Sequence, residues 1–217
     1  SLGVGTDRLT RLFERYGRSV VEGAWADLLD YSERRMCQGL AEVPDGTYRA
    51  EDVIDDDGIN DRPIKIDIAI TFEGERVIVD LTGSDAQAEG NTNSTIANTH
   101  AAIYYVMIAV IDAGAPPNSG CYRPIEVVTK PGSVVDPLPP GAVAARTNCS
   151  QKIVEAMFQA LAPVLPERVT AGSHGQITTC GFGGIDPSTG ERFIFTDIQG
   201  GGNGARPTKD GADGQDS

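Results

Sequence analysis

The sequence predicts an α+β fold, with an antiparallel sheet, flanking helices and a second lobe that also contains β-strands. Residues 1–43 show helical periodicity, residues 64–81 alternate as a half-buried strand does, and the chain after residue 137 returns to strands beyond a proline-rich stretch. With 217 residues, of which 40% are hydrophobic, the chain can bury a core in one ordinary domain or two small ones.

Two helices are expected in the first 43 residues. The spacing i, i+3, i+4, i+7 is met by Leu9, Leu12, Phe13 and Tyr16. Gly17 interrupts this stripe, and a second stripe runs from Val21 to Leu40, close to Pro44. We therefore expect two helices that meet at a corner.

Residues 64–72 and 76–81 are expected to form an antiparallel hairpin about a turn at residues 73–75. The first segment alternates apolar with polar or small side chains, which is typical of a strand with one buried face. Its apolar positions are Ile64, Ile66, Ile68, Ile70 and Phe72. We expect a third strand over residues 47–54.

Further elements are expected along the rest of the chain. Residues 95–112 are apolar nearly all round, which predicts a buried helix, and a short strand follows at residues 124–129. Residues 150–161 have apolar side chains on one helical face, which predicts another helix. Residues 176–182 and 192–198 are expected to pair as strands, before a Gly-rich loop.

This pattern divides the chain into a helical segment (1–43), an α+β lobe (44–136) and a second α+β lobe (137–217) that ends in the Gly-rich loop. Neither a helix nor a central strand accommodates the prolines at 137, 139 and 140, so we place a boundary there. The chain ends in polar residues without a closing element, and we expect a fragment of a longer subunit.

Composition and charge exclude several classes of partner. Asp and Glu total 31 against 18 Lys and Arg, which gives a net charge of -13 and argues against a nucleic-acid partner. The longest apolar run, residues 101–111, is about half the length that spans a bilayer, and no secretion signal opens the chain. We expect a soluble cytoplasmic protein without a membrane partner, with its four widely spaced cysteines as free thiols.

Few residues in the chain are suited to bind a metal ion. There are only two histidines, so a site built on several imidazoles cannot lie wholly within this chain. The acidic turn at residues 55–58 lacks the spacing of a calcium-binding loop, and is either a solvated turn or another hard-cation site. His100 is either a hydrogen-bonded core residue or a catalytic group, while His174, in a loop with glycines, fits a structural role as well as an acid–base role.

The Gly-rich loop at residues 200–207 has the composition of an anion-binding loop. Consecutive glycines let backbone N–H groups converge on an anion. The loop lacks the Gly-Lys-Ser/Thr ending of a phosphate-binding loop, and Pro207 opposes a following helix, so nucleotide binding is not expected. Asn203 and Arg206 are suited to bind a carboxylate or carbonyl oxygen, and a purely structural turn is the alternative.

Seven ordered stretches carry a family resemblance. They are residues 29–36 (LDYSERRM), 44–48 (PDGTY), 51–58 (EDVIDDDG), 79–84 (VDLTGS), 116–125 (PPNSGCYRPI), 150–154 (SQKIV) and 201–214 (GGNGARPTKDGADG). Together they closely resemble the hydantoinase B/oxoprolinase family, which includes the B-type component of N-methylhydantoinase and the C-terminal half of 5-oxoprolinase. The resemblance spans nearly the whole chain.

The resemblance implies part of a two-component, ATP-dependent enzyme that hydrolyses a cyclic amide such as a hydantoin, 5-oxoproline or a related lactam. An A-type partner subunit with an ATPase fold would hold ATP with Mg and phosphorylate the carbonyl oxygen, and the B-type part would complete ring opening by water. The resemblance also implies an oligomeric parent, a divalent metal held through residues outside this chain, and no activity of the fragment alone.

The residues assigned to the active-site wall are chosen by residue chemistry, and the resemblance points only to the stretch 201–214. Arg206 and Asn203 would hold oxyanion or carboxylate groups, and His174 would act as acid or base. The expected catalytic residues are His174, Asp197 and Arg206, and the expected substrate-binding residues are Gly201, Gly202, Asn203, Gly204, Asp210 and Asp213.

Three other functions stay open at this point. The chain would also suit a B-like subunit of an enzyme of the acetone or acetophenone carboxylase type, or a non-catalytic middle domain of such a subunit. A stand-alone module that binds a small molecule is the third.

Overall fold

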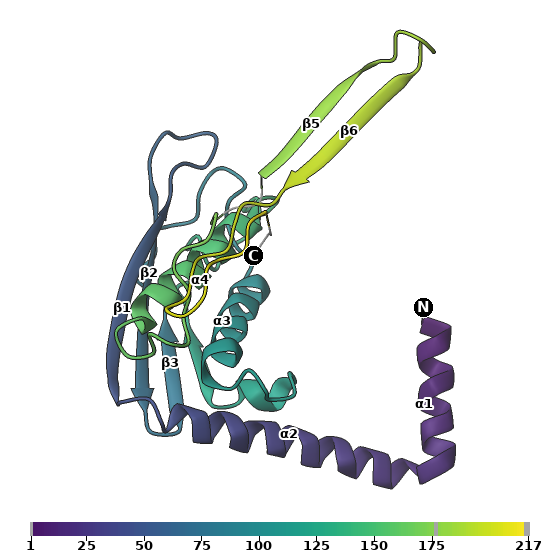
Figure 1. Cartoon of the computed structure of the whole chain (residues 1–217), viewed down its shortest axis with the longest axis vertical. Helices are drawn as coiled ribbons and strands as arrows, with labels where there is room; N and C mark the ends of the chain where they lie inside the picture. Colours follow the sequence, from purple (N-terminus) through teal and green to yellow (C-terminus); the bar gives the residue numbers. More distant parts are fainter. Residues whose placement is uncertain (1, 176–177, 215–217) are drawn as a thin grey trace.

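The computed structural model describes residues 2–175 and 178–214 and confirms the α+β fold (Figure 1). Its elements in chain order are α1 (Leu2–Tyr16), α2 (Arg18–Leu40), β1 (Gly46–Ile54), β2 (Ile64–Glu73), β3 (Arg76–Asp80), α3 (Ile96–Ile111), the 3-10 helix η1 (Ser119–Tyr122), β4 (Ile125–Val128), α4 (Arg146–Leu161), β5 (Thr178–Ile185) and β6 (Arg192–Gln199). Every helix and strand expected from the sequence is present close to its expected bounds. Residues 176–177 of one expected strand lie outside the described residues.

The four strands β1, β2, β3 and β4 form one sheet in that order. β1 pairs with β2, and β2 with β3, in the expected antiparallel sense. β4 runs parallel to β3, so the sheet is mixed, and the predicted antiparallel arrangement holds for β1, β2 and β3 but not for β4. The reason is the connection, because α3 and η1 lie between β3 and β4, and a long crossover returns the chain to the same end of the sheet.

The hydrophobic core lies between this sheet and two helices. α4 packs on β1 and β2, and α3 packs on α4. All five apolar positions expected to face inward from β2 are buried: Ile64, Ile66, Ile68, Ile70 and Phe72. The largest fully buried side chains of α4 are Ile153, Met157 and Leu161.

One hydrophobic cluster joins the parts of the chain on both sides of the proline-rich stretch. It includes residues from Met36 to Val169, because α4 packs back on strands that precede residue 137. The boundary at residue 137 stays a prediction. In the described residues, burial gives way to largely exposed side chains after Val169.

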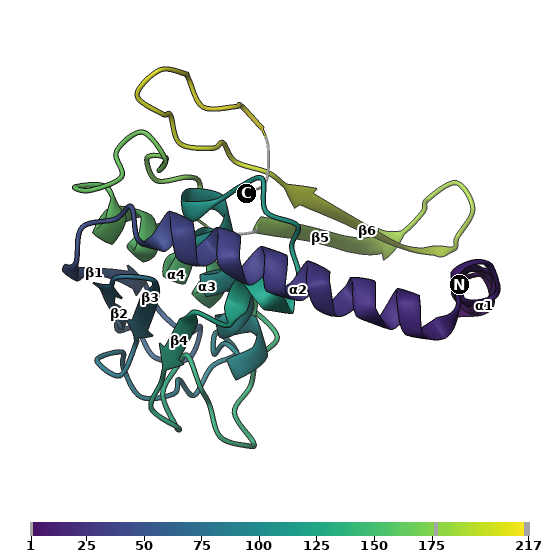
Figure 2. The ribbon, with the colours of Figure 1, turned by 90° about the horizontal axis from the view of Figure 1, so that it is seen from below.

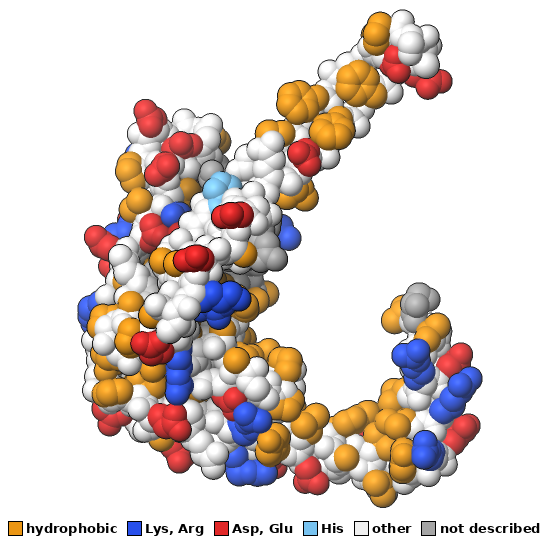
Figure 3. Space-filling model, in the orientation of Figure 1, with side chains coloured by type: hydrophobic (Ala, Val, Ile, Leu, Met, Phe, Trp, Pro, Cys, Tyr) orange, Lys and Arg blue, Asp and Glu red, His pale blue; other side chains and the backbone are white. Residues whose placement is uncertain are grey.

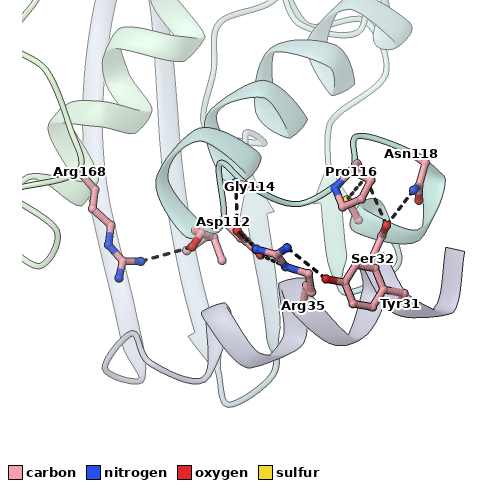
Figure 4. Close-up of polar contacts among 10 residues, drawn as sticks. Tyr31, Ser32, Arg35, Asp112, Gly114, Pro116, Asn118 and Arg168 are labelled. Carbon is pink, nitrogen blue, oxygen red and sulfur yellow. Dashed lines mark hydrogen bonds and ion pairs between the residues drawn. The ribbon is translucent and has the colours of Figure 1, made fainter. Parts of the chain in front are cut away.

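The second half of α2 is fixed to the body by polar contacts (Figure 4). Arg35 donates two hydrogen bonds to the Asp112 carboxylate, with N···O distances of 2.6 and 2.7 Å. Ser32 donates to the carbonyl oxygen of Pro116 at 3.3 Å and accepts from Asn118 Nδ2 at 2.7 Å. A forked arginine–carboxylate pair fixes direction as well as distance, so these bonds set the angle at which α2 leaves the body.

α1 and the first half of α2 form an arm that extends from the body (Figures 1 and 2). Gly17, with φ of 83°, makes the corner that the sequence predicted between the two helices. Phe13 packs edge to face on Trp25 across this corner, with ring centroids 6.0 Å apart. α1 has no buried residue, and apolar side chains gather on the surface of the arm (Figure 3).

β5 and β6 form a separate antiparallel hairpin that projects from the body (Figure 1). Every residue of β6 is exposed. The large exposed apolar residues of the hairpin are Phe182, Ile185, Phe193, Ile194, Phe195 and Ile198. The arm and the hairpin together present apolar surface that the described residues leave uncovered (Figure 3).

The acidic turn at residues 55–58 is neither fully solvated nor arranged around a cation. Asp57 is buried, and its Oδ1 accepts from the backbone N–H groups of Ile59 and Asn60. Its Oδ2 accepts from the N–H of Gly90 at 3.0 Å, which ties this turn to the segment before α3. A Cβ at Gly90 would fall on the carbonyl oxygen of Asp57, so only glycine allows this approach. Asp57 therefore has a structural role.

Replacing Asp57 with asparagine is expected to lower the melting temperature at pH 7 by several degrees. Hydrogen bonds from the N–H groups of Asn60, Gly90 and Ile59 hold the pKa of the Asp57 carboxyl well below its ordinary value of 3.8. Because the folded pKa is depressed, this stabilisation is present above pH 3.8 and is lost as the pH falls further. Thermal unfolding measured from pH 7 to pH 2 should show the melting temperatures of wild type and Asp57→Asn approaching each other only in acid. Asp55→Asn, at an exposed neighbour, is the control, and an equal effect of both substitutions would contradict the assignment.

The structure also confirms the expected state of the cysteines, since all four are free. Burial raises the pKa of the Cys149 thiol to about 12, which keeps it protonated and unreactive at neutral pH. Among residues 2–175 and 178–214, no helix combines the length and the apolar character required to cross a membrane.

Candidate functional site

An open pocket of about 1000 Å³ lies where the sheet, the two core helices and the C-terminal loops meet. β1, α3 and α4 supply one part of its lining, and residues 170–173 together with loop residues between 203 and 212 supply the rest. The lining mixes apolar groups such as Val154 and Phe158 with charged and amide side chains. Such a combination is typical of small-molecule sites, in which a few polar groups orient a largely apolar ligand.

Three extended backbone segments cross beside this pocket and hold the Gly-rich loop in place. Ala171 N–H donates to the carbonyl oxygen of Ala205 at 2.8 Å, and Asn203 N–H donates to that of Ala212 at 2.9 Å. A Cβ at Gly204 would fall on the carbonyl oxygen of Ala171. Part of the glycine content is therefore required by the close approach of backbone to backbone.

A cluster of ionised side chains joins β1, α4 and the 173–175 loop at the pocket. Lys152 Nζ lies 3.1 Å from Glu155 Oε2 and 3.4 Å from Asp52 Oδ2. Ser173 Oγ donates to Glu155 Oε1 at 3.2 Å, and the N–H of Gly175 donates to Ser173 Oγ at 3.3 Å. We call Asp52, Lys152, Glu155 and Ser173 the lysine cluster.

Two opposing effects act on the charge of Lys152. Burial alone would lower the pKa of its ammonium group, but the hydrogen bond to Glu155 and the attraction of Glu155 and Asp52 outweigh burial, so the pKa is raised. Lys152 therefore stays protonated at neutral pH. With one cation between two carboxylates, the lysine cluster has a net charge of -1.

Four of the residues assigned to the site from the sequence line the pocket together: Asn203, Gly204, Arg206 and Asp210. Gly201 and Gly202 lie in the same loop beside the pocket, and the N–H of His174 donates to the carbonyl oxygen of Gly202 at 3.0 Å. Asp213 pairs with Gly202 through an isolated bridge. Asp197 is exposed on β6, opposite Cys180, and is not part of the pocket lining.

His100, the other histidine, lies on α3. Its Nδ1 is 3.4 Å from the hydroxyl oxygen of Tyr104, one helical turn away. Tyr104 in turn stacks on Tyr122, with ring centroids 4.1 Å apart. His100 thus belongs to an aromatic cluster next to the pocket-lining part of α3, and does not itself line the pocket.

Sequence reasoning did not assign the lysine cluster to the site. Lys152 and Glu155 are three residues apart on one helix, which usually indicates a solvated ion pair. The available signal was the position of the pair at the edge of the apolar face of α4, beside Val154 and Phe158. Lys209, which lines the pocket as Asp52, Glu155 and Ser173 do, was not assigned either.

The Gly-rich loop is not arranged as a phosphate-binding loop. The N–H groups of Asn203 and Arg206 are engaged with backbone carbonyls, so they do not converge on an anion as a phosphate-binding loop requires. Within residues 2–175 and 178–214, no group of three His, Cys, Asp or Glu side chains is arranged to hold a metal ion.

The fold is an α+β module with a pocket that is lined by a Gly-rich loop, two helices and one edge of the sheet. This chain belongs to the hydantoinase B/oxoprolinase family, whose pattern it matches over residues 1–217. It is 32% identical over 225 residues to a Pseudomonas sp. strain NS671 protein named as the B-type component of a D-/L-hydantoinase, covering 99% of this chain and 38% of that protein.

Two solved structures share the fold. The ATP-dependent caprolactamase from Pseudomonas jessenii matches with a TM-score of 0.83 and 26% identity, over 98% of this chain and 37% of that one. Nucleotide-free acetone carboxylase matches with a TM-score of 0.77 and 13% identity, over 96% of this chain and 31% of that one, which shows likeness of fold alone. The chain thus spans well under half the length of these relatives.

Proposed function

We propose that this chain is part of the B-type component of a multi-subunit, ATP-dependent enzyme that hydrolyses a cyclic amide. The observation that carries the proposal is the family match over all 217 residues, together with relatives described as a hydantoinase component and a caprolactamase. In this proposal an A-type subunit with an ATPase fold holds ATP and Mg, and the complete enzyme is an oligomer in the cytoplasm. The B-type component with its A-type partner is called the parent assembly below.

A buried acceptor in the pocket supports an amide rather than a ketone as the substrate. Gln151 Oε1 is buried in the lining and has no hydrogen-bond partner among the described residues. A buried acceptor without a donor is costly, so a bound ligand that donates a hydrogen bond is favoured there. The ring N–H of a cyclic amide is such a donor, whereas a simple ketone has none.

The residues of this chain would bind and orient the substrate. ATP in the partner subunit would activate the amide carbonyl. The pocket residues would bind and orient the substrate. Arg206 and Asn203 hold the oxygen on which negative charge develops, where preorganised donors contribute most to rate. His174, beside the Gly-rich loop, is the proposed acid or base, with Asp197 retained as a catalytic candidate on the neighbouring hairpin.

The uncovered apolar surfaces are assigned to assembly. The arm formed by α1 and the first half of α2, and the β5–β6 hairpin, expose large apolar side chains, among them Trp25 and Phe182. Exposed apolar surface of this extent is characteristic of protein–protein contacts. We assign both surfaces to contacts with the rest of the parent assembly.

The proposed reaction is tested by ATP hydrolysis in the parent assembly. Hydantoins, 5-oxoproline, other lactams and small ketones are supplied with and without bicarbonate, and ring opening is followed together with ADP release. ATP turnover coupled to ring opening without bicarbonate supports the proposal. Turnover that requires both a ketone and bicarbonate would place the protein with the carboxylases instead.

Arg206→Ala in the parent assembly is expected to reduce turnover about 100-fold, as loss of a donor to a developing oxyanion does elsewhere. Arg206 is exposed at the pocket and has no ion pair among the described residues, so its removal should leave the fold intact. Steady-state kinetics measure the effect, and size-exclusion chromatography checks assembly. Normal turnover with lost assembly would identify a scaffold rather than a site.

A further inference from the structure

We infer that Glu155 is a positioning residue, which holds the 173–175 loop and thereby fixes His174 beside the Gly-rich loop. In the proposed function, on which this inference rests, His174 is the acid or base. Glu155 acts through His174 and does not itself touch the reacting atoms.

Two hydrogen bonds tie the residues on either side of His174 to α4. Ser173 Oγ donates to Glu155 Oε1 at 3.2 Å, and the backbone N–H of Gly175 donates to Ser173 Oγ at 3.3 Å. The Ser173 hydroxyl group takes part in both bonds, so the loop closes around it. The chain before and after His174 is therefore attached to one carboxylate oxygen.

The backbone of Gly175 packs against the same carboxylate. A Cβ at Gly175 would lie 3.0 Å from both Oε1 and Oε2 of Glu155. Gly175 is buried, and its φ of 74° lies in the left-handed region that favours glycine. The loop thus contacts Glu155 through its backbone as well as through Ser173.

The Gly-rich loop holds His174 from the other side. The N–H of His174 donates to the carbonyl oxygen of Gly202 at 3.0 Å. A Cβ at Gly201 would fall on Cβ and Cγ of His174, so the side chain of His174 lies directly against this loop. The place of the imidazole is therefore set jointly by residues 173–175 and residues 201–202.

Glu155 is itself held on a rigid element. Lys152 Nζ lies 3.1 Å from Oε2 of Glu155, which leaves Oε1 for Ser173, and only 15% of the Glu155 side chain is exposed. On the same helix, Ile153 and Met157 are fully buried in the core. A functional group is placed accurately when its supporting residues are fixed by packing and by charge-assisted hydrogen bonds. Glu155 meets both conditions.

The test measures whether Glu155 acts on turnover. Hydantoin, 5-oxoproline and caprolactam are supplied with ATP to the parent assembly, and the substrate that the wild type opens fastest is used for every variant. Glu155→Ala should lower kcat about 10-fold or more with little change in KM, because a displacement of about 1 Å can cost about 100-fold in rate. Ser173→Ala removes the same link without removing a charge, and should lower kcat to a similar extent.

A double-mutant cycle separates positioning from a general structural role. In a His174→Ala background, Glu155→Ala should change kcat less than about 2-fold, because the group that Glu155 positions is absent. Hydrogen exchange of residues 171–175, measured without substrate, should be faster in Glu155→Ala and in Ser173→Ala than in the wild type. Glu167→Ala is the matched control, since Glu167 is exposed, lies outside the pocket lining and has no ion pair in the described part of the chain.

The outcomes distinguish the inference from the proposed function. Equal losses of kcat for Glu155→Ala in the wild-type and His174→Ala backgrounds would overturn the inference, and so would wild-type kcat in Ser173→Ala. In both cases ring opening by the wild type would continue to support the proposed function. If Glu155→Ala fails to fold, Ser173→Ala takes its place in the same cycle. If the wild type opens none of the three cyclic amides, the proposed function fails and the inference fails with it.

Discussion

Replacement of Gly204 with alanine is expected to reduce turnover of the parent assembly more than 100-fold while the sheet and the core helices stay folded. The added Cβ would fall on the carbonyl oxygen of Ala171. Neither backbone can move aside freely, because Ala171 N–H is bonded to Ala205 and Asn203 N–H to Ala212. The three segments must separate, and Arg206 would then lose its place at the pocket. A displacement of about 1 Å in a catalytic constellation commonly costs 100-fold in rate.

The control for Gly204→Ala is a glycine of the hairpin. A Cβ at Gly181 would meet no atom within 4 Å, so Gly181→Ala tests the chemical change without the clash. Circular dichroism and thermal unfolding measure the fold, and hydrogen exchange of residues 201–213 measures the loop. Wild-type kinetics in Gly204→Ala would show that the crossing of the three segments does not support the site.

Strand pairing was predictable where a short stretch of sequence determines which strand lies next to it. The alternation from Ile64 to Phe72 specifies one buried face, and the two-residue turn that follows requires an antiparallel neighbour. β4 has only four residues, Ile125–Val128, and its direction follows from a crossover of more than 40 residues. Its parallel pairing therefore could not be predicted from local periodicity.

The arm shows a second limit of periodicity. The two stripes, one with Leu9 and Leu12 and the other with Trp25, were correctly predicted as helical, but a stripe does not specify what covers it. In the structure these side chains are exposed. An apolar stripe thus predicts burial only when the chain that it packs against is known.

The loop residues of the candidate site were predictable from the sequence, but the lysine cluster was not. Residues such as Asn203 and Arg206 are informative in sequence because polar side chains among glycines point to a loop that contacts a ligand. Asp52 and Ser173 are separated from Lys152 by 100 and 21 residues, and no local pattern relates them. Only the packing of α4 on β1 and on the 173–175 loop brings them together.

Lys152→Met is expected to destabilise the chain by about 1–3 kcal/mol at pH 7. Methionine keeps the length of the lysine stem, but it leaves Asp52 and Glu155 without their shared cation. Removing one member of a fully buried ion pair costs about 3–5 kcal/mol, and partial solvent exposure of these side chains, 15–26%, reduces that cost. Chemical denaturation of wild type and variant measures the difference.

A second substitution and the pH dependence identify the cause of this destabilisation. Lys152→Met/Glu155→Gln removes a charge of each sign, so it should recover part of the lost stability, while Glu155→Gln alone should be destabilising. The folded pKa of Lys152 is raised above its ordinary value of 10.5, so its contribution is fully present below pH 10.5 and is lost as the pH rises through the folded pKa. The gap between wild type and Lys152→Met should therefore stay constant from pH 7 to pH 10 and narrow only above that. A gap that is the same at pH 11.5 as at pH 7 would mean that lost packing of the lysine stem, and not its charge, explains the effect.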